Sequence, residues 1–449
     1  MHHSNDFSEL RYSVDREQCL DFRGNSDVLH KKRIGNFLKL VELLAQSDAV
    51  MADHVHRIKN EEINTHYLVK NIQNELIQII EKRIREEVLS KLQMAKYFST
   101  IVDCTQDVSK VEQMSNVLRF VQMKNAEVKV CEHFIDFIPV EQTTGAALKD
   151  VILQILTQTG IPIEDMRGQG YDNGANMRGH QSGVQKRILE KNSRVFFVPC
   201  HAHSLNLVVN DAAKSSREVV AYFEMVQAIY NFLSGSSRRW TNIEIDISEA
   251  KQTLNKKVNF LKLYRSDEAF KKVISDAELI AAELDLEPSF LFEVSIRPSA
   301  INWIEERFNQ LYENCDVFQF LYDFANIKKD FSKESHREKY ELLALSELIE
   351  PKTSPLKVLE FILRNNNFTP NISIALRILL TQPVSVASAE RSFSKLKLIK
   401  DYLRSIMSQN RLTGLSLISI ESDMAKKLDF TELMKAFASE KSRRVNFFH

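Results

Sequence analysis

The sequence predicts a mixed α+β protein in which helices pack on the faces of a five-stranded sheet. Three alternating, β-branched and aromatic runs follow one another within residues 97–140 without a helix between them. In residues 141–215, short apolar runs then alternate with helical patterns. Consecutive strands tend to pair antiparallel, whereas strands separated by a helix tend to pair parallel. The sheet is therefore expected to begin antiparallel and to continue with parallel crossovers.

The five strands are predicted at 97–105, 114–122, 130–140, 166–172 and 195–200. The polar link 123–129 joins the second and third strands into a hairpin. The next helix is expected to begin at Thr143 or Thr144 and to end before Gly160, because Thr caps helix N-termini and Gly follows their C-termini. Two more helices are predicted at 174–192 and 201–215. This order, β-β-β-α-β-α-β-α, is that of the ribonuclease-H-like fold.

Helical patterns flank this core on both sides in the sequence. Apolar residues recur every three or four positions within 31–92, which predicts two helices joined by the polar stretch 54–64. Residues 217–345 contain long, charged amphipathic stretches. A last helical block runs from Pro355 to the C-terminus with an interruption at 381–388.

The 449 residues carry 60 basic and 60 acidic side chains, so the chain has no overall positive field. A dedicated nucleic-acid-binding protein usually has a basic excess, and DNA contact here would have to come from a local patch. Five cysteines at irregular spacing, without a C-x-x-C pair, favour a reducing compartment over a disulfide scaffold. The start is not apolar and no run of about 18 apolar residues follows. We therefore expect a nuclear or cytosolic protein without a membrane partner.

Two aspartates are candidate metal ligands. Asp103 closes the first predicted strand and Asp172 the fourth, and the topology places these two strand ends side by side. Neighbouring carboxylates repel each other unless a cation lies between them, and Mg²⁺ and Mn²⁺ prefer carboxylate oxygens. Two such ions can activate a nucleophile and stabilise the leaving oxygen of a phosphodiester. The alternative is a turn or cap role, which suits Asp172 followed by Asn173 and Gly174.

The glycines near Asp172 do not form a nucleotide-binding loop. Gly168, Gly170 and Gly174 lack the G-x-G-x-x-G spacing, and no P-loop Lys-Ser/Thr follows them. We expect these glycines to let the backbone turn tightly beside Asp172. The sequence therefore predicts no small-molecule cofactor.

Cys200 and His203 form a C-x-x-H pair where the fifth strand meets the next helix. A lone pair cannot fill a tetrahedral zinc site, and no second pair with ligand spacing follows elsewhere in the sequence. We therefore expect a structural role, in which the two side chains pack the helix against the sheet or form hydrogen bonds across the junction.

Glu390 lies in a predicted helix that begins at Ser385 or Ser388. It borders the apolar face of this helix, and periodicity alone favours a solvated charge pair with Arg391. Several apolar residues of the last block can pack either within the fold or across a dimer, with core packing as the default: Leu396, Ile399, Leu403, Leu412, Leu415 and Ile418.

Three blocks together resemble the hAT superfamily of DNA transposases, in the branch that includes the zinc finger MYM-type and related domesticated proteins. The blocks are FSTIVDCTQDVSKVEQMSNVLRFV, GYDNGANMRG followed by VPCHAHSLNLVV, and QPVSVASAERSFSKLKLIKDYLRSIMSQNRL. The resemblance implies a ribonuclease-H-like core with a helical insertion and a C-terminal dimerisation region. The expected division is 1–94 for an N-terminal helical region, 95–235 for the first part of the core, 236–350 for a shortened insertion and 351–449 for the dimerisation region that completes the core.

The resemblance also implies site residues. Asp103 and Asp172 match the motifs of the first two catalytic aspartates, and Glu390 resembles the third acidic residue of the DDE triad. The family chemistry is Mg²⁺-dependent hydrolysis and transfer of DNA strands, for which these three residues would hold Mg²⁺ or Mn²⁺. Cys200 and His203 match the family's C-x-x-H pair, for which the architectural role is retained.

Two departures from the family pattern shape the expected function. No segment has zinc-finger spacing, and the stretch after 236–240 lacks the block whose Trp handles a flipped base; the two tryptophans are Trp240 and Trp303. We therefore expect a non-autonomous or domesticated protein that dimerises, associates with DNA and keeps a relict DDE site. The alternative is an active Mg²⁺-dependent transposase or nuclease that cuts and joins transposon ends.

Overall fold

The computed structural model describes residues 35–63, 68–215, 336–350 and 353–440, apart from short gaps at 173, 180–181 and 402–403, together with a few isolated positions elsewhere. By their contacts, the residues form two compact units, Leu205–Gln310 and the rest of the chain. The fold and the site described below belong to the second of these units. Most of the predicted insertion, including Trp240 and Trp303, lies outside the described residues.

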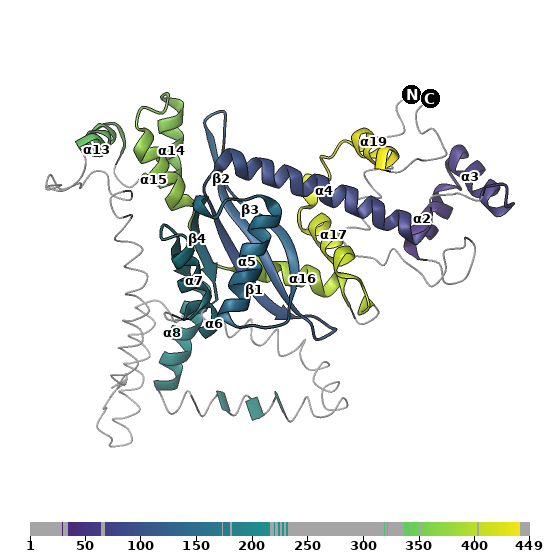
Figure 1. Ribbon diagram of the computed structural model, residues 1–449, viewed down its shortest axis with the longest axis horizontal. Coiled ribbons are helices and arrows are strands. Elements are labelled where there is room, and N and C mark those ends of the chain that lie inside the picture. Colours follow the sequence, from purple (N-terminus) through teal and green to yellow (C-terminus); the bar gives the residue numbers. More distant parts are fainter. Residues whose placement is uncertain are drawn as a thin grey trace, which may run out of the picture. The chain divides into compact units, whose positions relative to one another are not determined.

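The sheet contains the five predicted strands, which are β1 (Phe98–Gln106), β2 (Glu112–Lys124), β3 (Glu127–Val140), β4 (Met166–Tyr171) and β5 (Phe196–Pro199). Their order across the sheet is β3-β2-β1-β4-β5. The central strand β1 pairs antiparallel with β2 and parallel with β4, and β5 continues the parallel half (Figure 1). The predicted mixed sheet, with an antiparallel beginning and a parallel continuation, is confirmed.

The β2–β3 hairpin turns more tightly than the sequence predicts. Only Asn125 and Ala126 connect the two strands. Both residues have positive φ, 52° and 61°, as in a type I′ turn. The sequence predicts the longer link 123–129 because Ala rarely adopts positive φ and no Gly marks the turn.

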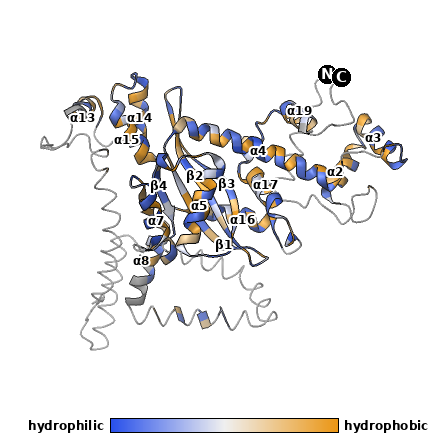
Figure 2. Ribbon diagram, in the orientation of Figure 1, coloured by the Kyte–Doolittle hydropathy of each residue, from blue (hydrophilic) through white to orange (hydrophobic). Residues whose placement is uncertain are grey.

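One apolar core joins the sheet to helices that precede and follow it in the sequence. α4 (Lys70–Ala95) contributes Val88 and Leu92, and α5 (Gly145–Thr159) packs Leu148 into the same cluster. Figure 2 shows hydrophobic and hydrophilic residues mixed along both helices, as expected for amphipathic helices that cover a sheet. In the part of the chain that the structure describes, no helix has the length and apolar character that a bilayer span requires.

The described part of the N-terminal region contains three helices where the sequence predicts two. α2 (Asn36–Leu44) and α3 (Ala49–Lys59) precede α4. The carboxylate of Asp48 accepts hydrogen bonds from the N–H groups of Val50 and Met51, each at 2.9 Å, and so starts a new helix. Periodicity alone does not show this break, because the cap lies inside one continuous polar-apolar pattern.

Helix α5 begins and ends as predicted, whereas the helix after β4 does not. Thr144 caps α5, and Gly160 ends it with a left-handed φ of 67°. The single helix predicted after β4 is instead two helices, α6 (Ala175–Arg178) and α7 (Val184–Lys191). The backbone of Gly183 approaches the end of α6 so closely that any side chain there would collide with it. This close approach separates the two helices.

The C-terminal region is helical, as predicted. Its helices are α13 (His336–Leu348), α14 (Pro355–Arg364), α15 (Pro370–Thr381), α16 (Ala387–Ile399), α17 (Gln409–Ile420), α18 (Ser422–Ala425) and α19 (Phe430–Glu440). α16 and α17 contact the sheet, and they bury Leu396, Ile399, Leu412 and Ile418 in the central core. These four residues therefore pack within the fold, which is the default that the sequence favours; Leu403 lies outside the described residues.

Two glycines of β4 admit the segment that leads into α16. A Cβ on Gly170 would lie 2.7 Å from Cγ of Pro383, and a Cβ on Gly168 would lie 2.6 Å from Oε1 of Gln382. The side-chain amide of Gln382 also donates to a backbone carbonyl of β4 at 3.1 Å. The prediction that these two glycines form a turn beside Asp172 is therefore wrong, because they lie within β4 and make room for another segment.

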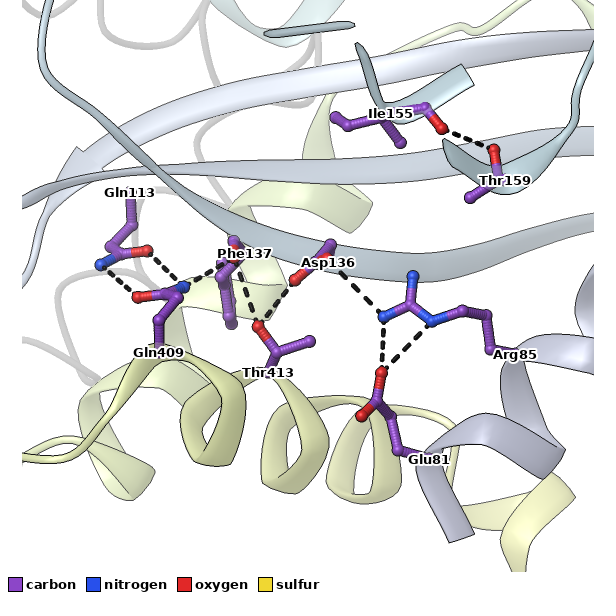
Figure 3. Close-up of polar contacts among 9 residues, drawn as sticks. All are labelled: Glu81, Arg85, Gln113, Asp136, Phe137, Ile155, Thr159, Gln409 and Thr413. Carbon is purple, nitrogen blue, oxygen red and sulfur yellow. Dashed lines mark hydrogen bonds and ion pairs between the residues drawn. The ribbon is translucent and has the colours of Figure 1, made fainter. Parts of the chain in front are cut away.

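A polar network attaches α17 and α4 to β3 (Figure 3). Oγ1 of Thr413 donates to Oδ1 of Asp136 at 2.7 Å, and Nη2 of Arg85 lies 3.6 Å from Oδ2 of the same carboxylate. Arg85 also donates to Oε1 of Glu81 at 2.8 Å. Burial raises the pKa of Asp136 to about 6, although Arg85 and Thr413 act in the opposite direction. Gln409 adds a hydrogen bond of 2.7 Å to a backbone carbonyl of β3.

A second polar contact lies where the β2–β3 register shifts. Oε1 of Glu421 accepts from the N–H of Phe134 at 2.7 Å, and Oε2 lies 2.8 Å from Nδ1 of His133. Burial alone would lower the pKa of His133, but its contacts with Cys131 and with the Glu421 carboxylate raise it to about 9. The buried ion pair therefore fixes the end of α17 to the irregular part of β3.

We expect Glu421→Gln to lower the free energy of unfolding by about 1–3 kcal/mol near pH 6.5, because it removes a charged acceptor from two buried donors. The folded-state pKa of His133 is raised from 6.5 to about 9, so the ion pair stabilises the protein fully below pH 6.5 and loses its effect as the pH rises through 9. Urea unfolding should therefore show a difference between wild type and variant that shrinks over this interval. Glu86→Gln, at a half-exposed ion pair, is the matched control; a pH-independent difference would contradict this account.

We expect Gly170→Ala to destabilise the protein by about 1–3 kcal/mol, because the new methyl group would overlap the ring of Pro383. Pro383→Gly removes that ring and should recover part of the loss. A double-mutant cycle measured by chemical unfolding checks the coupling. Simple additivity of the two changes would show that the ring and the glycine do not meet.

Candidate functional site

The structure brings Asp103 and Asp172 to the same part of the sheet. In the parallel pairing of β1 with β4, Ile101 lies opposite Gly170. Asp103 lies two residues after Ile101, and Asp172 lies two residues after Gly170. The two aspartates therefore lie beside each other where these adjacent strands continue. Asp103 lies inside β1 rather than at its end, because the strand continues to Gln106, whereas Asp172 directly follows β4 as predicted.

Helix α16 brings Glu390 near Asp103. Asp103 pairs with Ser115 of β2, so the two side chains share one face of the sheet. Oγ of Ser115 lies 2.8 Å from Oγ of Ser392, which fixes the first turns of α16 to that face. Glu390 lies in the first turn of the same helix, close enough to Asp103 to influence its ionisation.

The N-terminus of α16 differs from the prediction. The residue before the helix is Val386, and no side chain caps it, so neither Ser385 nor Ser388 begins the helix as a cap. At the other end, Nζ of Lys400 lies 2.6 Å from Oδ2 of Asp107, and both side chains are buried. This ion pair ties the end of α16 to the turn after β1, so the helix is anchored to the sheet along its length.

Electrostatics at the three carboxylates favours a bound cation. Burial raises the pKa of Asp103 to about 6; the N–H of Cys104, which donates to Oδ1 at 2.9 Å, opposes this, and the carboxylates of Asp172 and Glu390 raise the pKa further. Neighbouring like charges are costly unless a cation compensates them.

The donor set fits a hard divalent cation. All three side chains offer carboxylate oxygens, and Glu390 is 43% exposed, which leaves room for water ligands. Asp103, Asp172 and Glu390 are therefore the residues that would hold Mg²⁺ or Mn²⁺. Such an ion would supply activation of a hydroxyl nucleophile and stabilisation of a leaving oxygen.

Cys200 connects three parts of this region. Its N–H donates to the carbonyl of Tyr171 at 3.2 Å, and its buried Sγ accepts from the N–H of Val386 at 3.4 Å. The thiol therefore lies between the end of β4 and the segment before α16. These contacts agree with the structural role expected for Cys200.

His203 has a neighbour that sequence reasoning missed. It lies in α8 (His201–Ser215), and its Nδ1 is 3.6 Å from Oε1 of Glu390. His203 also lowers the pKa of Asp103, against the larger opposing effect of burial, so it faces the carboxylates. Spacing could not reveal this contact, because the two residues come from distant parts of the sequence.

A polar cavity of about 280 Å³ lies elsewhere, between α4, α5 and β3. Arg85 and Asp136 line it, together with Gln154 and Gln158. Its charged groups already pair with each other, so they need no ligand to compensate them. In the carboxylate cluster, in contrast, Asp172 and Glu390 raise the pKa of Asp103 by like-charge repulsion, so this cluster is the candidate site.

Comparisons with known proteins match two parts of the chain to family models. Residues 12–183 match the family model described as ZMYM1/FAM200, RNase-like domain. Residues 339–424 match the hAT family C-terminal dimerisation region. The first match contains Asp103 and Asp172, and the second contains Glu390.

Two curated relatives share part of the chain. The human 52 kDa repressor of the inhibitor of the protein kinase is 28% identical over 151 residues, which are 34% of this chain and 19% of that protein. The mouse protein of the same name is 27% identical over 150 residues, or 33% and 19% of the two chains. The match thus spans about a fifth of the length of these relatives. Taken with the two family models and the five-stranded mixed sheet, it shows that the chain is a hAT-related protein with a ZMYM1/FAM200-type RNase-like domain and a hAT C-terminal dimerisation region.

Proposed function

We propose that this hAT-derived protein associates with itself and with DNA, and that its three carboxylates are a relict DDE site. The match of residues 339–424 to a hAT dimerisation region is the observation that carries the self-association. The absence from the sequence of the family's Trp block after 236–240 supports the relict character of the site. A nuclear location follows from this proposal.

Contact between two copies of the chain requires apolar side chains that are not already buried within the fold. The buried residues of α16 and α17 already pack against the sheet, so they do not provide it. Within the matched region, Ile406 is 96% exposed and Leu398 is 50% exposed. Exposure of large apolar side chains to water is unfavourable, and their burial by a second copy would lower the free energy. We assign these two residues to the contact between copies.

We expect the purified protein to sediment as a dimer at micromolar concentration. Leu398→Asp combined with Ile406→Asp should raise the dissociation constant roughly tenfold or more, because two apolar contacts would be replaced by charges. Val50→Asp, at an 81% exposed position of α3 outside the dimerisation region, is the matched control. A wild-type monomer under these conditions would overturn the proposed self-association.

Association with DNA has support from a local basic cluster on an otherwise neutral chain. The guanidinium carbons of Arg167 and Arg377 lie 4.7 and 5.2 Å from the centre of the Tyr97 ring, and Nζ of Lys96 lies 5.7 Å from it. Arg167 is only 6% exposed, so Lys96 and the part-exposed Tyr97 and Arg377 are the members of this cluster that nucleic acid could reach, by phosphate attraction and by stacking. Burial lowers the pKa of both arginines, although the nearby Tyr97 raises it.

A second candidate function is metal-dependent cutting and joining of DNA ends. It is favoured by one observation, the proximity of Asp103 to the carboxylates of Asp172 and Glu390, both of which raise its pKa. In this function the two aspartates would orient the reacting phosphate, and Glu390 would add a third carboxylate to the group that binds a cation.

Incubation of the protein with Mn²⁺ and hairpin or flanked DNA ends distinguishes the relict site from the metal-dependent nuclease. The relict site predicts no strand cleavage. Cleavage that disappears in Asp172→Asn but persists in Asp53→Asn, at a 69% exposed aspartate of α3, would establish the second candidate instead. Cleavage that survives Asp172→Asn would not come from this site.

A further inference from the structure

The structure supplies a third donor to the C-x-x-H pair. Sγ of Cys200, an imidazole nitrogen of His203 and a carboxylate oxygen of Glu390 all lie within 4.8 Å of one another. The first two residues come from the β5–α8 junction, whereas Glu390 comes from α16. The sequence argued against zinc, because two ligands, Cys200 and His203, cannot form a zinc site by themselves. The fold adds Glu390 as a third ligand and removes that objection.

We propose that Cys200, His203 and Glu390 bind a thiophilic divalent cation of the Zn²⁺ class. This position differs in chemistry from the all-oxygen set of Asp103 and Asp172, although Glu390 belongs to both. The inference depends neither on self-association nor on DNA cleavage.

The distances fit such a site. Bond lengths of about 2.3 Å to sulfur and about 2.0–2.1 Å to nitrogen or oxygen place tetrahedral ligands about 3.3–3.6 Å apart. Nδ1 of His203 is already 3.6 Å from Oε1 of Glu390. The widest pair, at no more than 4.8 Å, must close by about 1 Å. Glu390 is 43% exposed, so its side chain can rotate toward the other two ligands.

Two of the three donor atoms also lack a strong hydrogen-bond partner among the described residues. Nδ1 of His203 is enclosed but has no hydrogen-bond partner among the described residues. Enclosed polar atoms normally have a partner, so this nitrogen calls for one. Sγ of Cys200 has only a weak contact, from the N–H of Val386 at 3.4 Å. Metal coordination would satisfy both atoms.

The site is closed on one side and open on the other. Cys200 is 1% exposed, whereas the side chains of His203 and Glu390 are 40% and 43% exposed. The fourth tetrahedral position therefore faces solvent, where water can occupy it, as in zinc sites with three protein ligands.

The two neighbouring positions select different metals. Thiolate and imidazole ligands favour Zn²⁺ and Co²⁺, while carboxylate and water ligands favour Mg²⁺ and Mn²⁺. Because Glu390 belongs to both sets, an ion held by Cys200 and His203 draws that carboxylate away from Asp103 and Asp172. A thiophilic ion should therefore weaken Mn²⁺ binding by the aspartates.

Titration of the full chain with Co²⁺ tests the site, because cobalt–thiolate coordination produces a charge-transfer band and tetrahedral geometry produces strong visible bands. We expect one equivalent to bind and Zn²⁺ to displace it. Cys200→Ser should abolish the charge-transfer band, and Glu390→Gln should weaken binding roughly 10–100-fold or more. Absence of the band in the wild type, or its persistence in Cys200→Ser, would overturn the proposal.

Two controls separate this site from its surroundings. Cys131→Ser, at another buried cysteine, should leave the cobalt spectrum unchanged. Asp172→Asn should also keep the cobalt spectrum while it weakens Mn²⁺ binding, which distinguishes the two metal positions. If Cys200→Ser does not fold, protection of the wild-type Cys200 thiol from alkylation by added Zn²⁺ provides the same test; an unchanged alkylation rate would contradict coordination.

Discussion

The architecture of the site depends on one packing contact, the seating of the segment before α16 on the glycines of β4. Gly168 and Gly170 leave room for Gln382 and Pro383, and no larger residue would do so without displacing them. The hydrogen bond between Ser115 and Ser392 continues the attachment along α16. Through these contacts the sheet, which carries two of the acidic residues, acquires the third from a distant part of the chain.

Much of the fold was predictable because local physical chemistry determines it. Alternating apolar residues predicted the first three strands, short apolar runs between helical patterns predicted the last two, and Thr144 and Gly160 marked the limits of α5. The interruption after α6 was not predictable, because it arises from a close backbone approach at Gly183. The turn at Asn125 was also hidden, since its following residue is an Ala at positive φ.

The site was predictable only in part. Asp103 and Asp172 followed from the order of the strands, but periodicity assigned Glu390 to a solvated charge pair, and only the family resemblance marked it. The proximity of His203 to Glu390 depends on tertiary packing that neither spacing nor composition records. The order of the strands thus places the two aspartates, whereas tertiary contacts determine which other side chains lie beside them.

The order of the elements along the chain also affects synthesis. The last strand of the sheet ends at Pro199, but α16, which covers one of its faces, begins only at Ala387. At roughly 5–20 residues per second, a ribosome needs on the order of ten to forty seconds to make the residues between them. During that interval the part of the sheet that α16 later covers lacks that helix, so it is a natural substrate for chaperones that act during translation.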